Sequence, residues 1–404
     1  MSSLQTESVQ RFASRLDLVD DFLDRLNTLE YGILEIEVND HLFTVNGKQT
    51  GGSARIEILR FPEFLKKLYL KGDLGFAESY IAGDWRTPDL SALLYLLAKN
   101  RHRFIRVRKT SRLANLTNRI YHWVHRNTRH GSAKNIKAHY DLGNDFYKLW
   151  LDPGMTYSCA LFQTQEQSLA EAQDNKYRRI LDLLNPQPGS KVLEIGCGWG
   201  GFAVAAARRG IQVDGITLSP SQLKWAQNRI ERENMTGLVN LSLTDYRDIK
   251  GEYDHIVSIE MFEAVGEAYW SDYMAKLHRH LKPGGSAALQ VITIEEGAFG
   301  NYRTKPDFIQ RYIFPGGMLP SRSALVSTAA KHNLTLLRDD NFGLDYAKTL
   351  RHWQNRFNHV RKQVQAQGFD ERFLRMWRYY LSYCEAGFLA GRIDLHQIVL
   401  RENT

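Results

Sequence analysis

The feature that most constrains the fold is a regular alternation of amphipathic helices and short buried strands, which begins near residue 175. The strand-like segments are KVLEIG, IQVDGITLS, VNLSLTD, YDHIVSI and SAALQVITI, and helical stretches separate most of them. Strands that alternate with helices form a parallel sheet covered on both faces. The sequence therefore predicts an α/β, doubly wound, Rossmann-like domain whose ligands bind at the carboxyl ends of the strands.

A small α+β unit is predicted ahead of this domain. Alternating runs between residues 31 and 60, broken by Asn-Asp, Asn-Gly and Gly-Gly, are typical of a small antiparallel sheet. Residues 61–85 and the apolar run after Pro88-Asp89 are predicted to be helical. The predicted domains are residues 1–110, a connector helix at 111–131 and the Rossmann-like domain at 132–404. Within the latter, we expect one helix over 269–285 and a mostly helical tail over Ala347–Thr404.

A glycine cluster follows the first strand of the Rossmann-like domain, in KVLEIGCGWGGFA. Its spacing departs from the G-x-G-x-x-G pattern of dinucleotide-binding folds. Glu194 lies one residue before the strand ends, where its carboxylate can bind an ammonium group but would repel a pyrophosphate. Gly196 and Gly198 permit close approach of a ligand to the backbone. With the L-K-P-G-G segment at 281–285, a common companion in methyltransferases of this fold, the pattern indicates a site for S-adenosylmethionine (SAM); a purely structural turn is the alternative.

The ends of the next two strands supply the other predicted SAM contacts. After the second strand, where many SAM enzymes place an acid for the ribose hydroxyls, the candidates are Thr217, Leu218 and Gln222. After the third strand, the candidates for framing the adenine are Asp245, Tyr246 and Arg247.

Basic residues are concentrated in one block. Between Arg101 and Lys137 there are eleven Lys and Arg and no Asp or Glu, whereas the net charge of the whole chain is only +8. Within this block, SRLANLTNRIYHWVHR combines an apolar helical stripe with Arg112, Arg119 and Arg126 on another face. Such a helix can lie in a layer of lipid headgroups, or it can connect two domains and pack its apolar stripe on one of them. Both interpretations stay open.

Features of the whole chain favour a cytoplasmic protein. No apolar run approaches the ~18 residues of a membrane span, and the first residues lack the apolar core of a secretory signal. The widely spaced Cys159, Cys197 and Cys384 support neither a disulfide framework nor a metal site.

Longer motifs resemble the cyclopropane-fatty-acyl-phospholipid synthase family. They include AHYDLGNDFYKLWLD, MTYSCALF, LEIGCGWGGFA, GITLSPSQ, DYRD, IVSIEMFEAVG and YCEAGFLAGRIDLHQ, and GDLGFAESYIAGDW resembles that family's amino-terminal, lipid-associated domain. The resemblance covers nearly the whole chain. It implies transfer of a carbon from SAM to the cis double bond of an unsaturated phospholipid acyl chain, which closes a cyclopropane ring. It also implies a protein that associates peripherally with the cytoplasmic face of an anionic membrane.

The resemblance further implies a site for a base. Family members deprotonate a carbocation with bound bicarbonate, held by a cysteine, a glutamate, an isoleucine, a tyrosine and a histidine. We call these bicarbonate-binding residues the cage. By their positions in the matching motifs, the resemblance assigns to it Cys159, Glu263, Ile292 and Tyr346, with Gln290 in place of the histidine. Gln290 is expected to orient the bicarbonate without carrying a proton. Tyr157 and Ser158 of MTYSCALF are assigned to SAM binding.

Three alternatives remain. A sibling enzyme could use the same cation to make a methylene- or methyl-branched chain. A small-amine or nucleic-acid methyltransferase is the second alternative. The basic block makes nucleic acid conceivable, although no base-stacking motif is present and no nucleic-acid partner is predicted. A lipid-binding protein with a relic SAM fold is disfavoured by the intact glycines. The oligomeric state, a homodimer included, stays open.

Overall fold

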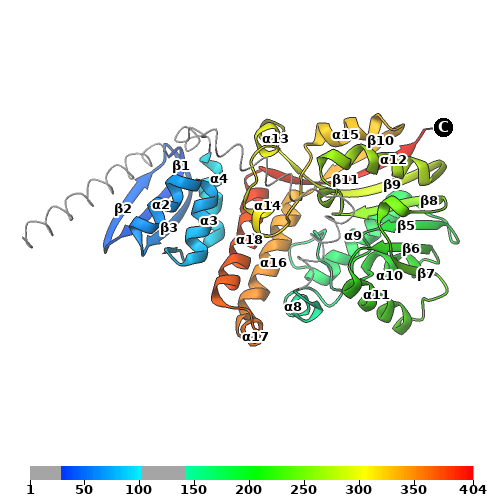
Figure 1. The fold of residues 1–404 in the computed structure, drawn as a ribbon, viewed down its shortest axis with the longest axis horizontal. Coiled ribbons are helices and arrows are strands. Elements are labelled where there is room, and N and C mark those ends of the chain that lie inside the picture. The colour runs from blue at the N-terminus through cyan, green and yellow to red at the C-terminus, as the bar shows by residue number, and fades with distance from the viewer. Residues whose placement is uncertain (1–28, 102–141, 404) are drawn as a thin grey trace, which may run out of the picture. The chain divides into compact units, whose positions relative to one another are not determined.

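The structure, a computed structural model, describes residues 29–101 and 142–403. The chain divides into two compact units, Met1–Lys109 and Thr110–Thr404 (Figure 1). The predicted connector at 111–131 lies outside the described residues, and so do its three arginines.

The amino-terminal unit contains a four-stranded sheet in the order β2-β1-β3-β4. The strands are β1 Tyr31–Val38, β2 His41–Asn46, β3 Gln49–Ile58 and β4 Trp85–Arg86. β1 pairs with β2 antiparallel but with β3 parallel, so the expected all-antiparallel sheet is wrong at this pair. The cause is the Asn-Gly link after β2, which crosses the end of β1 instead of closing a hairpin. There the Gly47 N–H donates to the Gly32 carbonyl at 2.8 Å, and a Cβ at Gly47 would lie 2.8 Å from that oxygen.

Three helices complete this unit, and all lie where the sequence predicts helix. They are α2 Phe61–Lys71, α3 Asp73–Ala82 and α4 Leu90–Lys99. Gly72, at a φ of 58°, separates the first two. The Asp89 carboxylate accepts a hydrogen bond from the Ala92 N–H at 2.9 Å and so caps the start of α4.

The carboxyl-terminal unit is built on a seven-stranded sheet in the order β10-β11-β9-β8-β5-β6-β7. Its strands are β5 Lys191–Ile195, β6 Gln212–Thr217, β7 Val239–Leu243, β8 Tyr253–Ile259, β9 Leu281–Ile294, β10 Leu334–Asn341 and β11 Ile393–Glu402. The five predicted strands, β5 to β9, are parallel. β11 is antiparallel to both of its neighbours, so the sheet is mixed. The strand order reverses between β5 and β8, which is where ligands bind in such sheets.

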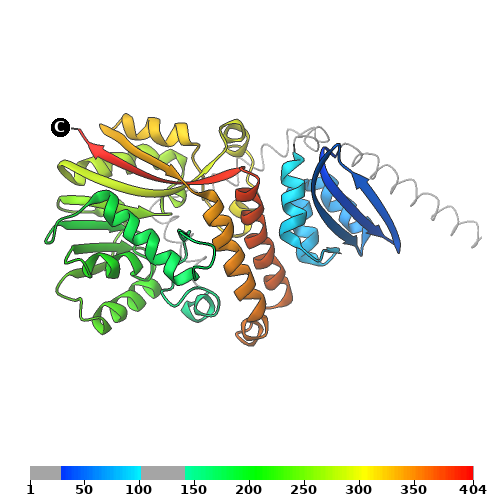
Figure 2. The same ribbon diagram turned by 180° about the vertical axis from the view of Figure 1, so that it is seen from behind.

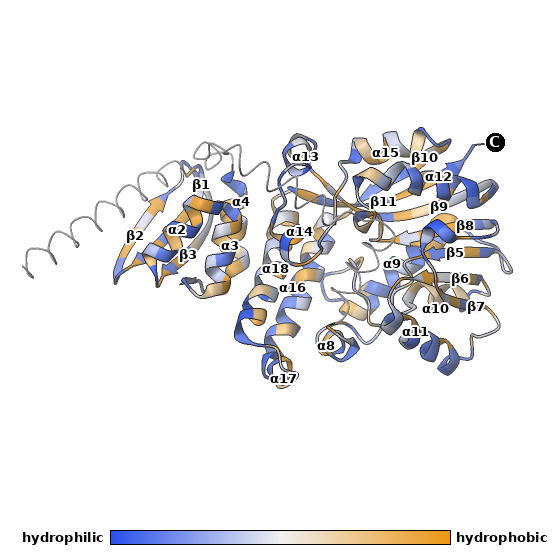
Figure 3. Cartoon of the chain, in the orientation of Figure 1, coloured by the Kyte–Doolittle hydropathy of each residue, from blue (hydrophilic) through white to orange (hydrophobic). Residues whose placement is uncertain are grey.

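Helices cover both faces of this sheet (Figures 1 and 2). The helices of this unit are α8 Asn144–Lys148, α9 Leu169–Leu184, α10 Gly201–Ala207, α11 Pro220–Arg232, α12 Trp270–His280, α13 Glu296–Tyr302, α14 Phe308–Tyr312, α15 Arg322–Ala330, α16 Gly343–His359, α17 Arg361–Ala366 and α18 Glu371–Leu389. Because side chains alternate along a strand, Val192 packs in a core with α9, α10 and α11, and Leu193 packs in a second core with α12 and α15. In Figure 3, the helices that cover the sheet carry both hydrophobic and hydrophilic residues.

One predicted boundary is wrong. α12 ends at His280, and Leu281 already belongs to β9, so the L-K-P-G-G segment opens a strand. The tail is mostly helical, as predicted, but its last segment, Ile393–Glu402, forms β11 between β10 and β9. α16 and α18 lie side by side ahead of it (Figures 1 and 2).

Candidate functional site

The glycine loop follows β5 at the point where the strand order reverses. Gly196, Gly198 and Gly200 have φ values of 85°, 51° and 80°, in the left-handed region that only glycine adopts without strain. A Cβ added at Gly198 would meet no atom within 4 Å, whereas one at Gly196 would lie 2.9 Å from Cγ of Met261. The loop therefore leaves open space at Gly198 and lies against the segment that follows β8.

Glu194, next to this loop, holds a buried carboxylate with unused hydrogen-bonding capacity. The residue is 3% exposed, and its Oε2 atom has no hydrogen-bond partner among the described residues. Burial raises the pKa of Glu194 to about 8, although buried Lys176 opposes the shift. A ligand ammonium group would satisfy this oxygen and favour the ionised form. The residues present therefore fit the amino-acid end of SAM.

The candidates after β6 and β7 lie at the same edge of the sheet. Thr217 is buried and donates to Oε1 of Gln222 at 3.4 Å, and its backbone carbonyl accepts from the Thr244 N–H. Leu218 follows Thr217 directly. Asp245 and Arg247 form an ion pair at 2.6 Å beside the buried ring of Tyr246. These candidates therefore lie at the carboxyl ends of β6 and β7, where Thr217 binds Gln222 and Asp245 binds Arg247.

Tyr157 and Ser158 lie in an irregular segment, and each is held by a partner on a helix. The Tyr157 hydroxyl lies 2.7 Å from that of Tyr380. Ser158 Oγ accepts a hydrogen bond from Nζ of Lys176 at 2.6 Å. Lys176 is completely buried, and burial lowers its pKa to about 8, against the influence of Glu260 and other acids nearby. Lys176 was not predicted as a site residue; it lies on the buried face of α9.

The five predicted cage residues form two hydrogen-bonded groups. In the first, the Ile292 N–H donates to Oε1 of Glu263 at 2.5 Å, while Oε2 of Glu263 is buried and has no partner among the described residues. In the second, Cys159, Gln290 and Tyr346 surround a single carboxylate. That carboxylate belongs to Glu260, which the sequence analysis did not single out.

Glu260 directly follows β8 and has a φ of 52°. Its Oε1 atom accepts hydrogen bonds from the backbone N–H of Cys159 at 2.8 Å and from Nε2 of Gln290 at 2.7 Å. Its Oε2 atom accepts from the Tyr346 hydroxyl at 2.6 Å. The signal in the sequence was an acid placed directly after a buried strand, where a parallel sheet presents its ligand site.

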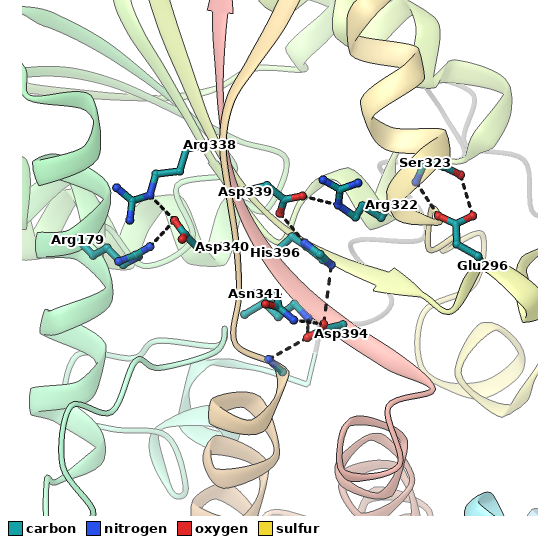
Figure 4. A network of polar contacts seen from close by, with 12 residues as sticks. Arg179, Glu296, Arg322, Ser323, Arg338, Asp339, Asp340, Asn341, Asp394 and His396 are labelled. Carbon is teal, nitrogen blue, oxygen red and sulfur yellow. Dashed lines mark hydrogen bonds and ion pairs between the residues drawn. The ribbon is translucent and has the colours of Figure 1, made fainter.

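A chain of hydrogen bonds fixes the direction in which Gln290 points. Arg179 on α9 binds Asp340 at 2.6 Å (Figure 4), and its Nε donates to Oε1 of Gln397 at 2.9 Å. Nε2 of Gln397 then donates to Oε1 of Gln290 at 2.9 Å. Because arginine can only donate, the amide nitrogen of Gln290 must face Glu260.

The two carboxyl groups of the base site lie in different environments. Burial, followed by repulsion from Glu260, raises the pKa of Glu263 to about 8. Burial also raises the pKa of Glu260, but the hydrogen bond from Tyr346 and the charge of Lys176 oppose that shift. The donors around Glu260 therefore favour its ionised form, whereas Glu263 keeps its proton near neutral pH. Within 29–101 and 142–403, no group of three or more His, Cys, Asp or Glu side chains could hold a metal ion.

Comparisons with known proteins identify the family. Residues 127–398 match the mycolic acid cyclopropane synthetase family. The chain belongs to this family. Tuberculostearic acid methyltransferase UfaA1 of Mycobacterium tuberculosis is 37% identical over 376 residues, which are 88% of this chain and 85% of that protein. Cyclopropane-fatty-acyl-phospholipid synthase of Escherichia coli is 36% identical over 375 residues, 90% of this chain and 92% of that protein.

Solved structures of this cyclopropane synthetase family share the fold. Mycolic acid cyclopropane synthase CmaA1, complexed with SAH and CTAB, is 32% identical and aligns with a TM-score of 0.63 over 67% of this chain and 98% of its own. Cyclopropane synthase MmaA2 from Mycobacterium tuberculosis gives the same values. The predicted Rossmann-like fold is confirmed, and the protein is a SAM-dependent methyltransferase.

Proposed function

We propose that this protein transfers a carbon from SAM to the cis double bond of an unsaturated phospholipid acyl chain and closes a cyclopropane ring. The Escherichia coli relative named for this activity aligns with 90% of the chain. The observation that carries the proposal is that the candidate SAM site and the base site lie next to each other at one edge of the sheet. Met261, which follows Glu260 of the base site, lies against Gly196 of the glycine loop.

The side chains around the base site suit a reaction through a carbocation. SAM, when bound, supplies an electrophilic methyl group on a sulfonium. The alkene attacks this methyl group, and the resulting cation must lose a proton before a nucleophile traps it. Burial holds the pKa of Cys159 and of Tyr346 well above the ordinary values. Both groups therefore stay neutral, and a neutral thiol is a poor nucleophile.

A methylene- or methyl-branched product is the second candidate. The relative UfaA1, named a tuberculostearic acid methyltransferase, is as similar to this chain as the Escherichia coli synthase is. The same cation gives a methylene branch if a hydride first shifts from the methylated carbon to the cationic carbon and the transferred carbon then loses a proton. A saturated methyl branch would require a reductant in addition.

We further propose peripheral binding to the cytoplasmic face of an anionic membrane, with residues 1–110 as a lipid-associated domain and 111–131 as a connector helix. The basic block supports this proposal, and α2 adds to it. Tyr69 and Leu70 on α2 are 46% and 67% exposed, and Lys66 and Lys71 are exposed beside them. Apolar side chains among lysines suit a headgroup layer. No helix in the described ranges is long and apolar enough to cross a membrane.

Gas chromatography with mass spectrometry of host lipids tests the proposed function. The chain would be expressed in a bacterium that lacks its own cyclopropane synthase. We expect cyclopropane acyl chains to appear in the phospholipid fraction at the expense of cis-unsaturated ones. Branched chains would establish the second candidate instead, and unchanged lipids despite folded protein would refute both.

A further inference from the structure

The predicted bicarbonate does not fit the cage that the structure shows. Three of the groups expected to hold it, the Cys159 segment, Gln290 and Tyr346, already bind the Glu260 carboxylate. Bicarbonate in the same place would lose these donors, and it would lie beside a carboxylate that carries negative charge. Two anions in one buried site repel each other strongly.

We propose that the Glu260 carboxylate takes the place of bicarbonate and is the base that removes the proton from the carbocation. This inference rests on the proposed function, because only a reaction through a cation requires such a base. With Glu260 as the base, the reaction does not require bicarbonate.

The hydrogen bonds leave Glu260 able to accept a proton. A carboxylate has about four lone-pair sites. Among the residues that the structure describes, Oε1 uses two of them for Cys159 and Gln290, whereas Oε2 accepts only the hydrogen bond from Tyr346. One lone pair on Oε2 therefore remains.

The neighbours of Glu260 also favour its ionised form. The three contacts are donors to a charged acceptor, the strong kind of hydrogen bond. The chain from Arg179 through Gln397 keeps the amide nitrogen of Gln290, and not its oxygen, against the carboxylate. A base positioned in this way is ready before substrate binds.

The proposed step balances as follows. The alkene electron pair forms a bond to the methyl carbon, and the carbon–sulfur bond breaks with its electrons going to sulfur. The adjacent alkene carbon becomes cationic. Glu260 then takes a proton from the transferred carbon, and the electrons of that C–H bond close the ring. The neutral Glu260 acid returns its proton to solvent before the next cycle.

The backbone conformation of Glu260 allows its role as the base to be tested by substitution. A non-glycine residue at a φ of 52° is unfavourable, so Glu260→Gly relieves this conformation while it removes the carboxylate. Glu260→Gln keeps the size of the side chain but cannot serve as a base. Glu252, exposed just before β8, provides the matched control Glu252→Gln.

The first experiment measures binding of ¹³C-labelled bicarbonate by NMR, without SAM or lipid. We expect no binding to the parent protein and binding to Glu260→Gly, where the carboxylate space is vacated. Binding to the parent, or its absence in folded Glu260→Gly, would overturn the proposal. This readout does not depend on turnover, so it stands even if the proposed substrate is wrong.

The second experiment follows methyl transfer to unsaturated phosphatidylglycerol vesicles in buffer freed of carbon dioxide. The parent and Glu252→Gln should have equal rates with and without added bicarbonate. Glu260→Gln should be slower by about 10²- to 10⁴-fold, the usual contribution of a general base, and should show a larger isotope effect with deuterated methyl SAM. Added bicarbonate should restore activity to Glu260→Gly. A parent that needs bicarbonate, or Glu260→Gln at the parental rate, would refute the assignment; no transfer by any variant would instead refute the proposed function.

Discussion

The Tyr346 hydroxyl donates a 2.6 Å hydrogen bond to the carboxylate of Glu260, a residue 86 positions earlier in the chain. This bond opposes the upward pKa shift that burial imposes on Glu260. It joins α16 to the end of β8 and thereby closes one side of the base site.

We expect Tyr346→Phe to move the acid limb of the pH–rate profile to higher pH. The base must be ionised, so the rate falls as the pH drops through the pKa of Glu260. Loss of the Tyr346 bond raises that pKa. A hydrogen bond to a charged group contributes about 1.5–3 kcal/mol, so the acid limb should move by about 1–2 pH units, and turnover at a pH on that limb should fall about 10- to 100-fold. An unchanged acid limb would show that Tyr346 does not act on the base.

SAM binding should release a proton and strengthen as the pH rises. Free Glu194 has a pKa raised by burial to about 8, and it must be ionised to bind an ammonium group. Below pH 8, binding therefore expels the proton, and affinity should rise by up to about tenfold per pH unit. Titration calorimetry in buffers of different ionisation enthalpy measures this release. Glu194→Gln should bind more weakly and release no proton; the same proton release in Glu194→Gln would exclude Glu194 as the ammonium partner.

Gly198→Ala should weaken SAM binding without disturbing the fold. A Cβ there meets no protein atom within 4 Å, so it would enter space left for a ligand. Gly251 also has a positive φ and open surroundings, which makes Gly251→Ala a matched control. Each change should cost about 1–2 kcal/mol of stability from backbone strain. Calorimetry should show reduced SAM affinity in Gly198→Ala alone; equal affinities would place the cofactor elsewhere.

Membrane binding should depend on the basic block. Each Lys or Arg near an anionic surface contributes about 1 kcal/mol, so replacing Arg112, Arg119 and Arg126 with alanine should weaken binding by about 3 kcal/mol. High salt should diminish the difference, because it screens the attraction. Co-sedimentation with anionic vesicles measures the effect. As a control, Arg208, Arg209 and Arg232, exposed in the segment from α10 to α11 and outside the basic block, would be replaced together.

Equal binding of the two triple variants at low salt would contradict a docking role for the block.

Gln290→His alone should not create a need for bicarbonate, because Glu260 still fills the cage. Combined with Glu260→Gly, the same histidine should give an enzyme that bicarbonate activates. For each variant, the measured quantity is the amount of cyclopropane product formed with bicarbonate divided by the amount formed without it. A single Gln290→His variant that bicarbonate activates would show that Glu260 does not fill the cage in solution.

The sequence predicted the features of the fold that depend on local pattern. Alternation of strands and helices predicted β5 to β9, and the glycines marked the loop beside Glu194. The parallel pairing of β1 and β3 was not predicted, because an Asn-Gly pair is typical of a hairpin turn. In the structure, the close approach of Gly47 to Gly32 instead takes the chain across the end of β1. β11 was missed because it follows a long helical segment and pairs with β9, about a hundred residues earlier.

The identity of the base could not be predicted for a similar reason. Glu260 and Glu263 lie three residues apart in one motif, and the resemblance directed attention to Glu263. Which carboxylate faces Tyr346 and Gln290 depends on residues that only the folded sheet and α16 bring together.

The central claim is that the methyl carbon of SAM enters the acyl chain of a phospholipid. Purified protein would be incubated with ¹³C-methyl SAM and vesicles of cis-unsaturated phosphatidylglycerol, and the lipids would be analysed by mass spectrometry and NMR. The account predicts one labelled CH₂ per modified acyl chain, in a cyclopropane ring at the former double bond, with no label in the headgroup. Label in the headgroup, or unmodified lipid after incubation with protein that binds SAM, would contradict it.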